Sequence, residues 1–261
     1  MASGKMVAIV TGSATGLGSA AAKMLAGKGW NVTINYTKSK DEALATEAEC
    51  RKLGAETLLV QADISKDEDC RRMADATIAK WGRVDGLINN AGTTIFKAHS
   101  SLDAINAEDF QRIYAVNVIG SYQMTRAVAA QMKKQGKGSV VNISSIAGVM
   151  GIGSSIAYAA SKGALNTMTL SLARALGPEI RVNAVCPGFI QSRWLRDGFG
   201  DEVYEAAKKG QEANTPLKRA GTPEDMAEVA VFFITAASNV TGELLIVDAG
   251  MHLGGAPLLA R

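Results

Sequence analysis

The sequence predicts one α/β domain over residues 1–261, in which helices cover both faces of a seven-stranded parallel sheet. Short runs rich in β-branched and apolar residues alternate with longer segments of helical period, which is the pattern of consecutive β-α-β units. Most of these runs are apolar at successive positions, as expected for strands that are buried on both faces. No low-complexity linker divides the chain. These observations favour a doubly wound fold without a second domain.

The predicted elements follow one another at the spacing that β-α-β units require. Leu17, Ala21 and Leu25 recur at helical spacing, so a helix is expected after the first strand. The basic stretch 133–137 is interpreted as the solvated end of a helix that precedes a strand. Residues 187–216 are predicted to form the one long irregular segment. The strands are expected at residues 7–11, 31–35, 56–61, 86–89, 139–143, 181–186 and 244–247.

Composition and charge argue against several kinds of protein. The formal net charge is only +3 and charges of both signs are interspersed, so nucleic-acid binding is not expected. Three cysteines without C-x-x-C spacing predict neither disulfides nor a zinc site, and His99 and His252 have no partners at metal-ligand spacing. The first apolar run is too short for a signal sequence or a membrane span. We therefore expect a cytoplasmic protein that holds no metal and does not bind membranes.

A glycine-rich stretch, Thr-Gly-Ser-Ala-Thr-Gly-Leu-Gly at residues 11–18, lies between the first predicted strand and the first predicted helix. Gly12 permits a tight turn, Gly16 lets the backbone approach a pyrophosphate, and Gly18 allows close packing of the helix. The helix N-terminus supplies amide donors and a partial positive charge. A flexible loop is the alternative for a bare glycine pattern, but the strand before it and the helix after it favour a dinucleotide site.

Further motifs follow the T-G-x-x-x-G-x-G spacing in a fixed order, and together they resemble those of the classical short-chain dehydrogenase/reductase family. The resemblance spans residues 6–250 and includes 3-oxoacyl-carrier-protein reductases and glucose-dehydrogenase-like members. It implies a Rossmann fold, an NAD or NADP cofactor, a small carbonyl or alcohol substrate and a homotetramer. The motifs are Asn89-Asn90-Ala91-Gly92, Asn117, Ser145, Tyr158-Ala-Ala-Ser-Lys162 and Pro187-Gly188.

Tyr158 and Lys162 are the central pair of the predicted catalytic site. Residues four apart share one face of a helix, so the ammonium group can reach the side of the site that holds the phenol. We expect this cation, with the positive nicotinamide, to lower the pKa of Tyr158 by about three units from ~10. A surface tyrosine above a solvated lysine is the alternative for the pair in isolation.

The resemblance assigns roles to the four expected catalytic residues. Tyr158 is the acid/base, Lys162 also holds the nicotinamide ribose, Ser145 hydrogen-bonds the substrate oxygen, and Asn117 supports a proton relay through a water. Ser144 competes with Ser145, and a buried, fully hydrogen-bonded asparagine is the alternative for Asn117.

The choice between NADP and NAD rests on the end of the second strand. Tyr36 stands where many NAD-preferring relatives carry an acid, so no carboxylate repels a 2′-phosphate. Ser13, Thr37, Lys38 and Ser39 are expected to bind such a phosphate, although the family's frequent arginine is absent, so the sequence favours NADP only slightly. Asp63 resembles the family's adenine-binding aspartate, with a helix N-cap as its alternative role. The expected cofactor contacts are Gly12, Ser13, Thr15, Gly16, Leu17, Gly18, Tyr36, Thr37, Lys38, Ser39, Asp63, Ile64, Asn90, Ala91, Gly92, Tyr158, Lys162, Pro187, Gly188, Ile190 and Ser192.

Residues 190–215 mix glycines with large apolar side chains, and we expect a mobile lid over the substrate. The sequence does not specify the substrate. A catalytically silent nucleotide-binding regulator or scaffold is the alternative function, and the intact catalytic set argues against it. Asp248 is expected to be structural. The apolar residues that either line a pocket or pack within the fold are Phe96, Met150, Ile152, Phe189, Trp194, Leu195, Phe199 and Tyr204.

Overall fold

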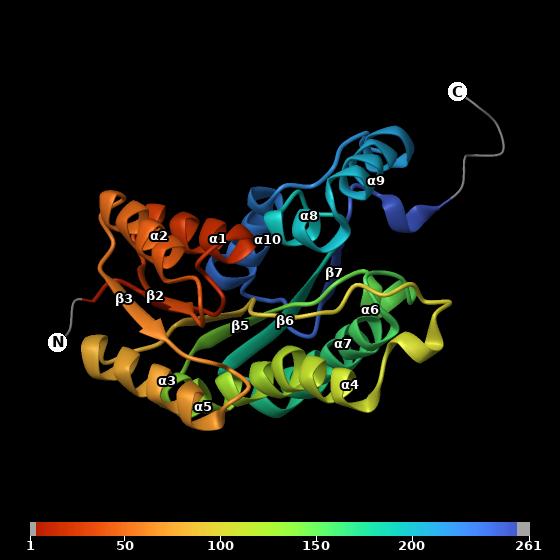
Figure 1. Cartoon of the computed structure of the whole chain (residues 1–261). Coiled ribbons are helices and arrows are strands. Elements are labelled where there is room, and N and C mark those ends of the chain that lie inside the picture. The colour runs from red at the N-terminus through yellow and green to blue at the C-terminus, as the bar shows by residue number, and fades with distance from the viewer. Residues whose placement is uncertain (1–3, 255–261) are drawn as a thin grey trace.

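The structure, a computed structural model, describes residues 4–254. Its strands form one parallel sheet in the order β3-β2-β1-β4-β5-β6-β7 (Figure 1). All seven predicted strands are confirmed, and each predicted end lies within one residue of the observed one. The strands are β1 (Val7–Val10), β2 (Asn31–Tyr36), β3 (Thr57–Gln61), β4 (Gly86–Asn89), β5 (Gly138–Ile143), β6 (Ile180–Pro187) and β7 (Leu244–Val247).

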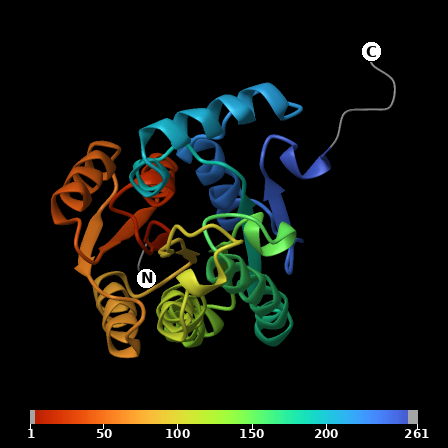
Figure 2. The same cartoon turned by 45° about the vertical axis from the view of Figure 1, so that its right-hand side comes forward.

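Helices cover both faces of this sheet, which confirms the predicted doubly wound Rossmann fold (Figure 1, Figure 2). One face is covered by α1 (Gly16–Gly27), α2 (Lys40–Lys52) and α10 (Pro223–Thr235), and the other by α3 (Asp67–Trp81), α5 (Ser121–Lys134) and α7 (Ile156–Leu176). The remaining helices are α4 (Ala107–Tyr114), a π-helix (Ala115–Gly120), α6 (Ala147–Met150), α8 (Arg193–Phe199) and α9 (Asp201–Asn214), with short 3₁₀ turns at Leu102–Ala104 and Met251–Leu253.

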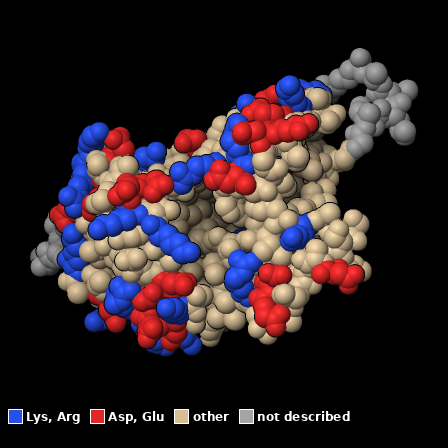
Figure 3. Space-filling model, viewed as in Figure 1, with Lys and Arg blue, Asp and Glu red and all other residues tan. Residues whose placement is uncertain are grey.

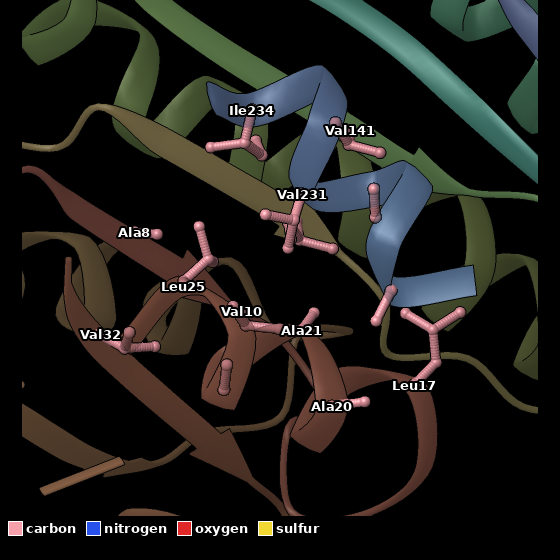
Figure 4. Close-up of a cluster of buried hydrophobic side chains, with 14 of the residues drawn as sticks. Ala8, Val10, Leu17, Ala20, Ala21, Leu25, Val32, Val141, Val231 and Ile234 are labelled. Carbon is pink, nitrogen blue, oxygen red and sulfur yellow. The ribbon is translucent and has the colours of Figure 1, made fainter. Parts of the chain in front are cut away.

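The core is divided by the sheet into two apolar clusters. In the first, Leu25 of α1 and Val231 of α10 pack on strand residues such as Val10 (Figure 4). Small residues such as Ala21 let α1 lie close to β1 and to α10. The second cluster fills the opposite face with Met73, Met124 and other fully buried side chains. Because both faces are buried, β1, β2 and β4 carry no exposed residue, and the apolar sequence of β1 predicts this directly.

The expectation of an irregular segment at residues 187–216 was wrong, because most of it is helical. Ser192 caps α8 by accepting a hydrogen bond from the amide of Leu195 at 3.3 Å, and Gly200 (φ +79°) turns the chain from α8 into α9. The glycines that favoured a loop have other uses. A Cβ atom at Gly198 would lie 2.1 Å from the ring of Phe96, so glycine here allows close packing of a helix.

The cysteines, the helix lengths and the candidate metal ligands of residues 4–254 bear on the predictions made from composition. Within this range, Cys50, Cys70 and Cys186 are buried free thiols. Burial raises the pKa of each thiol to about 11 or 12. The described part of the chain has no helix that is both long and apolar enough to cross a bilayer, and no group of His, Cys, Asp or Glu side chains placed to hold a metal ion.

Candidate active site

The glycine-rich turn lies where the strand order reverses, between β1 and β4, which is the usual ligand position in an open α/β sheet. Gly12 (φ +60°) donates its backbone amide to Oδ1 of Asn35 at 2.9 Å. The side chain of Asn90 crosses from β4 and donates to the carbonyl oxygens of Thr11 and Gly12, both at 2.9 Å. A Cβ atom at Gly18 would lie 2.4 Å from that Asn90 amide nitrogen, so the start of α1 packs closely against the Asn90 side chain that holds the turn.

The N-terminus of α1 fits the pyrophosphate of a dinucleotide. The N-cap residue Thr15 makes no side-chain capping hydrogen bond, and the first turn contains no acidic residue. Thr15 and Gly16 are both exposed, and nothing lies within 4 Å of the position that a Cβ atom on Gly16 would occupy. Open backbone amides and the positive end of the helix dipole therefore face solvent where an anion would sit.

Several residues of the expected cofactor set are part of the interior instead, among them Ser13, Leu17, Tyr36 and Ile64. Ser13 is fully buried, and its hydroxyl donates to the Val10 carbonyl at 2.7 Å and accepts from the amide of Asn35 at 2.9 Å. The prediction that the Ser13 side chain binds a 2′-phosphate was therefore wrong, because this hydroxyl fixes the turn. Leu17 and Ile64 belong to the two apolar clusters.

Polar residues remain at the end of β2, where a 2′-phosphate is expected. Tyr36 is buried, whereas Thr37 and Lys38 are exposed and Ser39 is half-buried. After the end of β3, the carboxylate of Asp63 accepts from the amide of Ser65 at 3.0 Å and from its hydroxyl at 2.7 Å. Asp63 is not the N-cap of α3, which is Lys66.

Tyr158 lies in the first turn of α7, held there by Ser155, whose hydroxyl accepts from the Tyr158 amide at 3.2 Å. Burial raises the pKa of Tyr158 to about 12, while a hydrogen bond with Ser145 acts in the opposite direction. Ser144 is turned away and donates to the carbonyl of Lys162 at 3.2 Å. The structure thus brings Ser145, rather than Ser144, to the phenol.

Lys162 is buried one turn further along α7. Its ammonium donates to the Ile143 carbonyl at 2.7 Å and lies 5.6 Å from the centre of the Tyr158 ring. Burial lowers the pKa of Lys162 to about 8. The expectation that Lys162 lowers the pKa of Tyr158 is not met by the chain's own residues, because desolvation of the phenol dominates and the ammonium is directed at a backbone carbonyl.

Asn117 lies in the π-helix and is fully buried. Its amide nitrogen donates to the Thr93 carbonyl and to the Ser161 hydroxyl, both at 3.0 Å, and its Oδ1 accepts from the Thr93 amide at 2.8 Å. Asn117 is therefore a buried, hydrogen-bonded asparagine, which was the alternative prediction for this residue. Asn117 still borders the site, since a Cβ atom on Gly92 would lie 3.4 Å from its Oδ1 and 3.8 Å from Nζ of Lys162.

Pro187 is the last residue of β6, and Gly188 follows it in the segment that leads to α8. A Cβ atom on Gly188 would lie 2.6 Å from Cβ of Asp248, which explains the glycine. Asp248 is structural, as expected, because its carboxylate accepts from the amides of Gly250 and His252 and pairs with the His252 ring. Ile190 forms a bridge with Gly221. Since Ser192 caps α8, its hydroxyl is committed to that helix.

The apolar residues near the lid divide into two groups. Phe96, Trp194 and Phe199 form an aromatic cluster beside Tyr158, with Trp194 and Tyr158 ring centres 6.2 Å apart. Phe189 instead packs against the buried ring of Tyr204, so these two belong to the fold. Figure 3 shows a hollow at the centre of the face drawn in Figure 1, with charged side chains of both signs along its upper rim.

Two residues that position the cofactor turn were missed from the sequence. Asn35 is 1% exposed although it lies in an apolar strand, and its side chain joins the Gly12 amide to the carbonyls of β3. The hydroxyl of Thr11 accepts from the amides of Asn90 and Ala91 at 2.9 and 3.0 Å. The available signal was a polar residue directly after an apolar strand for Thr11, and a polar residue between Ile34 and Tyr36 for Asn35.

Comparisons with known proteins agree with this geometry. Residues 12–252 match the family model described as enoyl-(acyl carrier protein) reductase. The chain belongs to the short-chain dehydrogenase/reductase family. A Streptomyces violaceoruber protein assigned as ketoacyl reductase 2 of the granaticin polyketide synthase is 42% identical, over 95% of this chain and 96% of that one. The L-rhamnose 1-dehydrogenase (NAD(P)(+)) of Sphingomonas sp. SKA58 is 37% identical, over 96% and 97%.

Solved structures of the family superpose on nearly the whole chain. Levodione reductase is 30% identical and aligns with a TM-score of 0.89 over 97% of this chain and 99% of its own. This member of the short-chain dehydrogenase/reductase family is therefore an NAD(P)-dependent oxidoreductase that acts on a carbonyl or alcohol group of a small molecule.

Proposed function

We propose that the chain reduces a ketone, or oxidises the corresponding secondary alcohol, with Tyr158 as the acid/base. The observation that carries this proposal is the grouping of Tyr158, its hydrogen-bonded Ser145 and the buried Lys162 at the carboxyl end of β5, beside the turn that fits a dinucleotide. Lys162, Asn90 to Gly92 and the glycine turn would hold the cofactor. A bound nicotinamide supplies or accepts the hydride.

The proposed proton transfer uses groups of this chain alone. In reduction, Tyr158 donates its proton to the substrate oxygen while the Ser145 hydroxyl holds that oxygen by a hydrogen bond. Because burial raises the pKa of Tyr158 to about 12, the phenol keeps its proton at neutral pH and is ready to act as the acid. The Lys162 ammonium, whose pKa is about 8, loses its proton as the pH rises through that value. Asn117 is proposed to hold the segment at Thr93 in place and to support proton relay.

We propose that the cofactor is NADP(H) rather than NAD(H). The exposed ammonium of Lys38 and the hydroxyls of Thr37 and Ser39 stand at the end of β2, where no acid follows the buried Tyr36. We expect kcat/KM to be higher with NADPH than with NADH, and Lys38→Glu to remove that preference by placing a carboxylate near the 2′-phosphate. Lys52→Glu, on the far end of α2, is the matched control and should leave the preference unchanged. A clear preference of the parent for NADH would overturn this proposal.

We also propose that α8 and α9 form a lid over the substrate. The only buried side chain within these two helices is that of Tyr204, so little apolar burial holds them down. Amide hydrogen exchange should be fast in α8 and α9 in the free protein and with cofactor alone, and should slow chiefly in the ternary complex. Equal, strong protection in all three states would mean a rigid wall.

The expected homotetramer and the expected cytoplasmic location of the protein remain predictions. Exposed large apolar side chains on the π-helix, α5, α10 and β7 support the expected homotetramer, since such surface is typical of subunit contacts; they are Ile119, Tyr122, Phe232 and Leu245. Unpaired, buried cysteines support the expected cytoplasmic location.

A further inference from the structure

The first helix of the lid, α8, makes aromatic contacts with Phe96, which lies in the segment that follows β4. The ring of Phe96 meets Phe199 edge-on, with centres 4.9 Å apart, and meets Trp194 edge-on at 5.8 Å. Gly198 lies directly against the same ring, because a Cβ atom there would be 2.1 Å from two of its carbons. With the lid in this position, these contacts place Trp194 and Phe199 beside Phe96.

Trp194 extends this cluster to the proposed acid/base. Its indole lies 6.2 Å from the Tyr158 ring, measured between centres, and the planes are inclined at 53°. Trp194 is nevertheless 45% exposed, so a large part of its apolar surface faces solvent beside the phenol. A molecule that reached the Tyr158 hydroxyl would cover this surface, and the burial would favour an apolar molecule with a flat face.

Gly153 lies beside the Tyr158 ring. Gly153 has φ +114°, and a Cβ atom there would lie 3.7 Å from Cδ1 of Tyr158 and 3.2 Å from Cβ of Ala147. A larger residue at position 153 would therefore stand against the phenol ring. The absence of a side chain at Gly153 keeps that part of the Tyr158 ring free of a bulky neighbour.

The charged groups of α8 are already paired. Arg193 donates to Glu42 of α2 at 3.0 Å, and Arg196 pairs with Asp201 at 2.8 Å and with Glu205 at 2.6 Å. Arg196 also stacks on the ring of Tyr204, away from the aromatic cluster. Both arginines of α8 are thus engaged by carboxylates of the protein, so this helix offers no unpaired arginine to a substrate carboxylate or phosphate and favours an uncharged substrate.

We propose that the substrate is an uncharged ketone on a flat ring system, an aryl or fused-ring ketone, whose ring covers the exposed surface of Trp194 while its carbonyl group reaches Tyr158. This inference rests on the proposed function, because it assumes that the carbonyl group reaches Tyr158. It adds the substrate class, which the catalytic residues do not determine.

The test compares 1-tetralone, a bicyclic aryl ketone, with ethyl acetoacetate, a small acyclic ketone, in the full-length protein with NADPH or NADH. We expect kcat/KM for 1-tetralone to exceed that for ethyl acetoacetate by about tenfold or more. Trp194→Ala should lower kcat/KM for 1-tetralone about tenfold, chiefly through KM, and should change that for ethyl acetoacetate less than about threefold. Trp81→Ala, at the distant end of α3, is the matched control and should change neither.

Binding gives a second readout that does not depend on turnover. 1-Tetralone should shift the indole N–H resonance of Trp194, assigned by its absence from the spectrum of Trp194→Ala, and should leave those of Trp30 and Trp81 in place. An unmoved Trp194 resonance at saturating 1-tetralone, or a higher kcat/KM for ethyl acetoacetate, would overturn the substrate class. If ethyl acetoacetate is reduced in a Tyr158-dependent manner while 1-tetralone is neither bound nor reduced, the substrate class fails and the proposed function stands. A ketone turned over equally by the parent and by Tyr158→Phe would instead overturn the proposed function.

Discussion

Tyr158→Phe should lower kcat by about 10² to 10⁴-fold while the affinity for the dinucleotide stays close to that of the parent. The substitution removes the proton that the substrate oxygen must receive, together with the hydrogen bond to Ser145, but leaves the ring in contact with Trp194. Steady-state rates and a fluorescence titration with NADPH measure the two quantities separately.

Tyr122→Phe is the matched control for this substitution, because it removes a phenol hydroxyl from an exposed tyrosine of α5. It should leave both rate and affinity unchanged. Turnover of Tyr158→Phe within about threefold of the parent would show that another group transfers the proton. A parent protein that binds NADPH and turns over no ketone or alcohol would favour the nucleotide-binding regulator or scaffold instead.

Gly18→Ala should have the second largest effect, on stability and on cofactor binding together. The added methyl group would lie 2.4 Å from the side-chain nitrogen of Asn90 and 2.6 Å from the carbonyl oxygen of Gly12, so α1 or the turn must move. Overpacking of this kind costs about 1 to 3 kcal/mol of unfolding free energy. We expect the dissociation constant of NADPH to rise about tenfold or more, since Asn90 shapes the turn, a change equal to about 1.4 kcal/mol. Denaturant unfolding and a binding titration measure the two effects.

Gly27→Ala is the control in the same helix, because nothing lies within 4 Å of the position that its Cβ atom would take. Alanine lowers the entropy of the unfolded chain and has the higher helix propensity, so this variant should be neutral or more stable by up to about 1 kcal/mol. If Gly18→Ala behaved like Gly27→Ala in both measurements, the contact between α1 and Asn90 would not hold the turn in its cofactor-binding shape.

Local patterns in the sequence were enough to predict the strands and the order of the motifs. The central strands of this sheet are buried on both faces, so a strand such as β1 is apolar at every position and can be recognised without knowledge of its neighbours. The glycine turn was predictable for the same reason, since Gly12 and Gly16 adopt positive φ angles that follow from the turn itself. The spacing of Tyr158 and Lys162 also acts within one helix.

The helices α8 and α9 were mispredicted as an irregular segment, in part because Gly198 acts through a tertiary contact. Gly198 is helical and lacks a side chain because Phe96, about a hundred residues earlier, occupies that space. The spacing of residues in the sequence does not show that Gly198 and Phe96 are neighbours. Ser13 was misassigned for a similar reason, since its hydroxyl bonds to Val10 and Asn35 within the interior.

The sequence by itself determined the parallel sheet, the dinucleotide turn and the identity of the candidate catalytic residues, because these depend on short-range patterns and on motif order. Only the tertiary structure decided which serine meets the phenol, that Asn117 is fully hydrogen-bonded, and that the pKa of Tyr158 is raised by burial rather than lowered by Lys162. It also brought Trp194 to Tyr158 and left Phe189 in the fold. Desolvation and ring packing depend on every group within a few ångströms, and that neighbourhood is assembled from segments far apart in the chain.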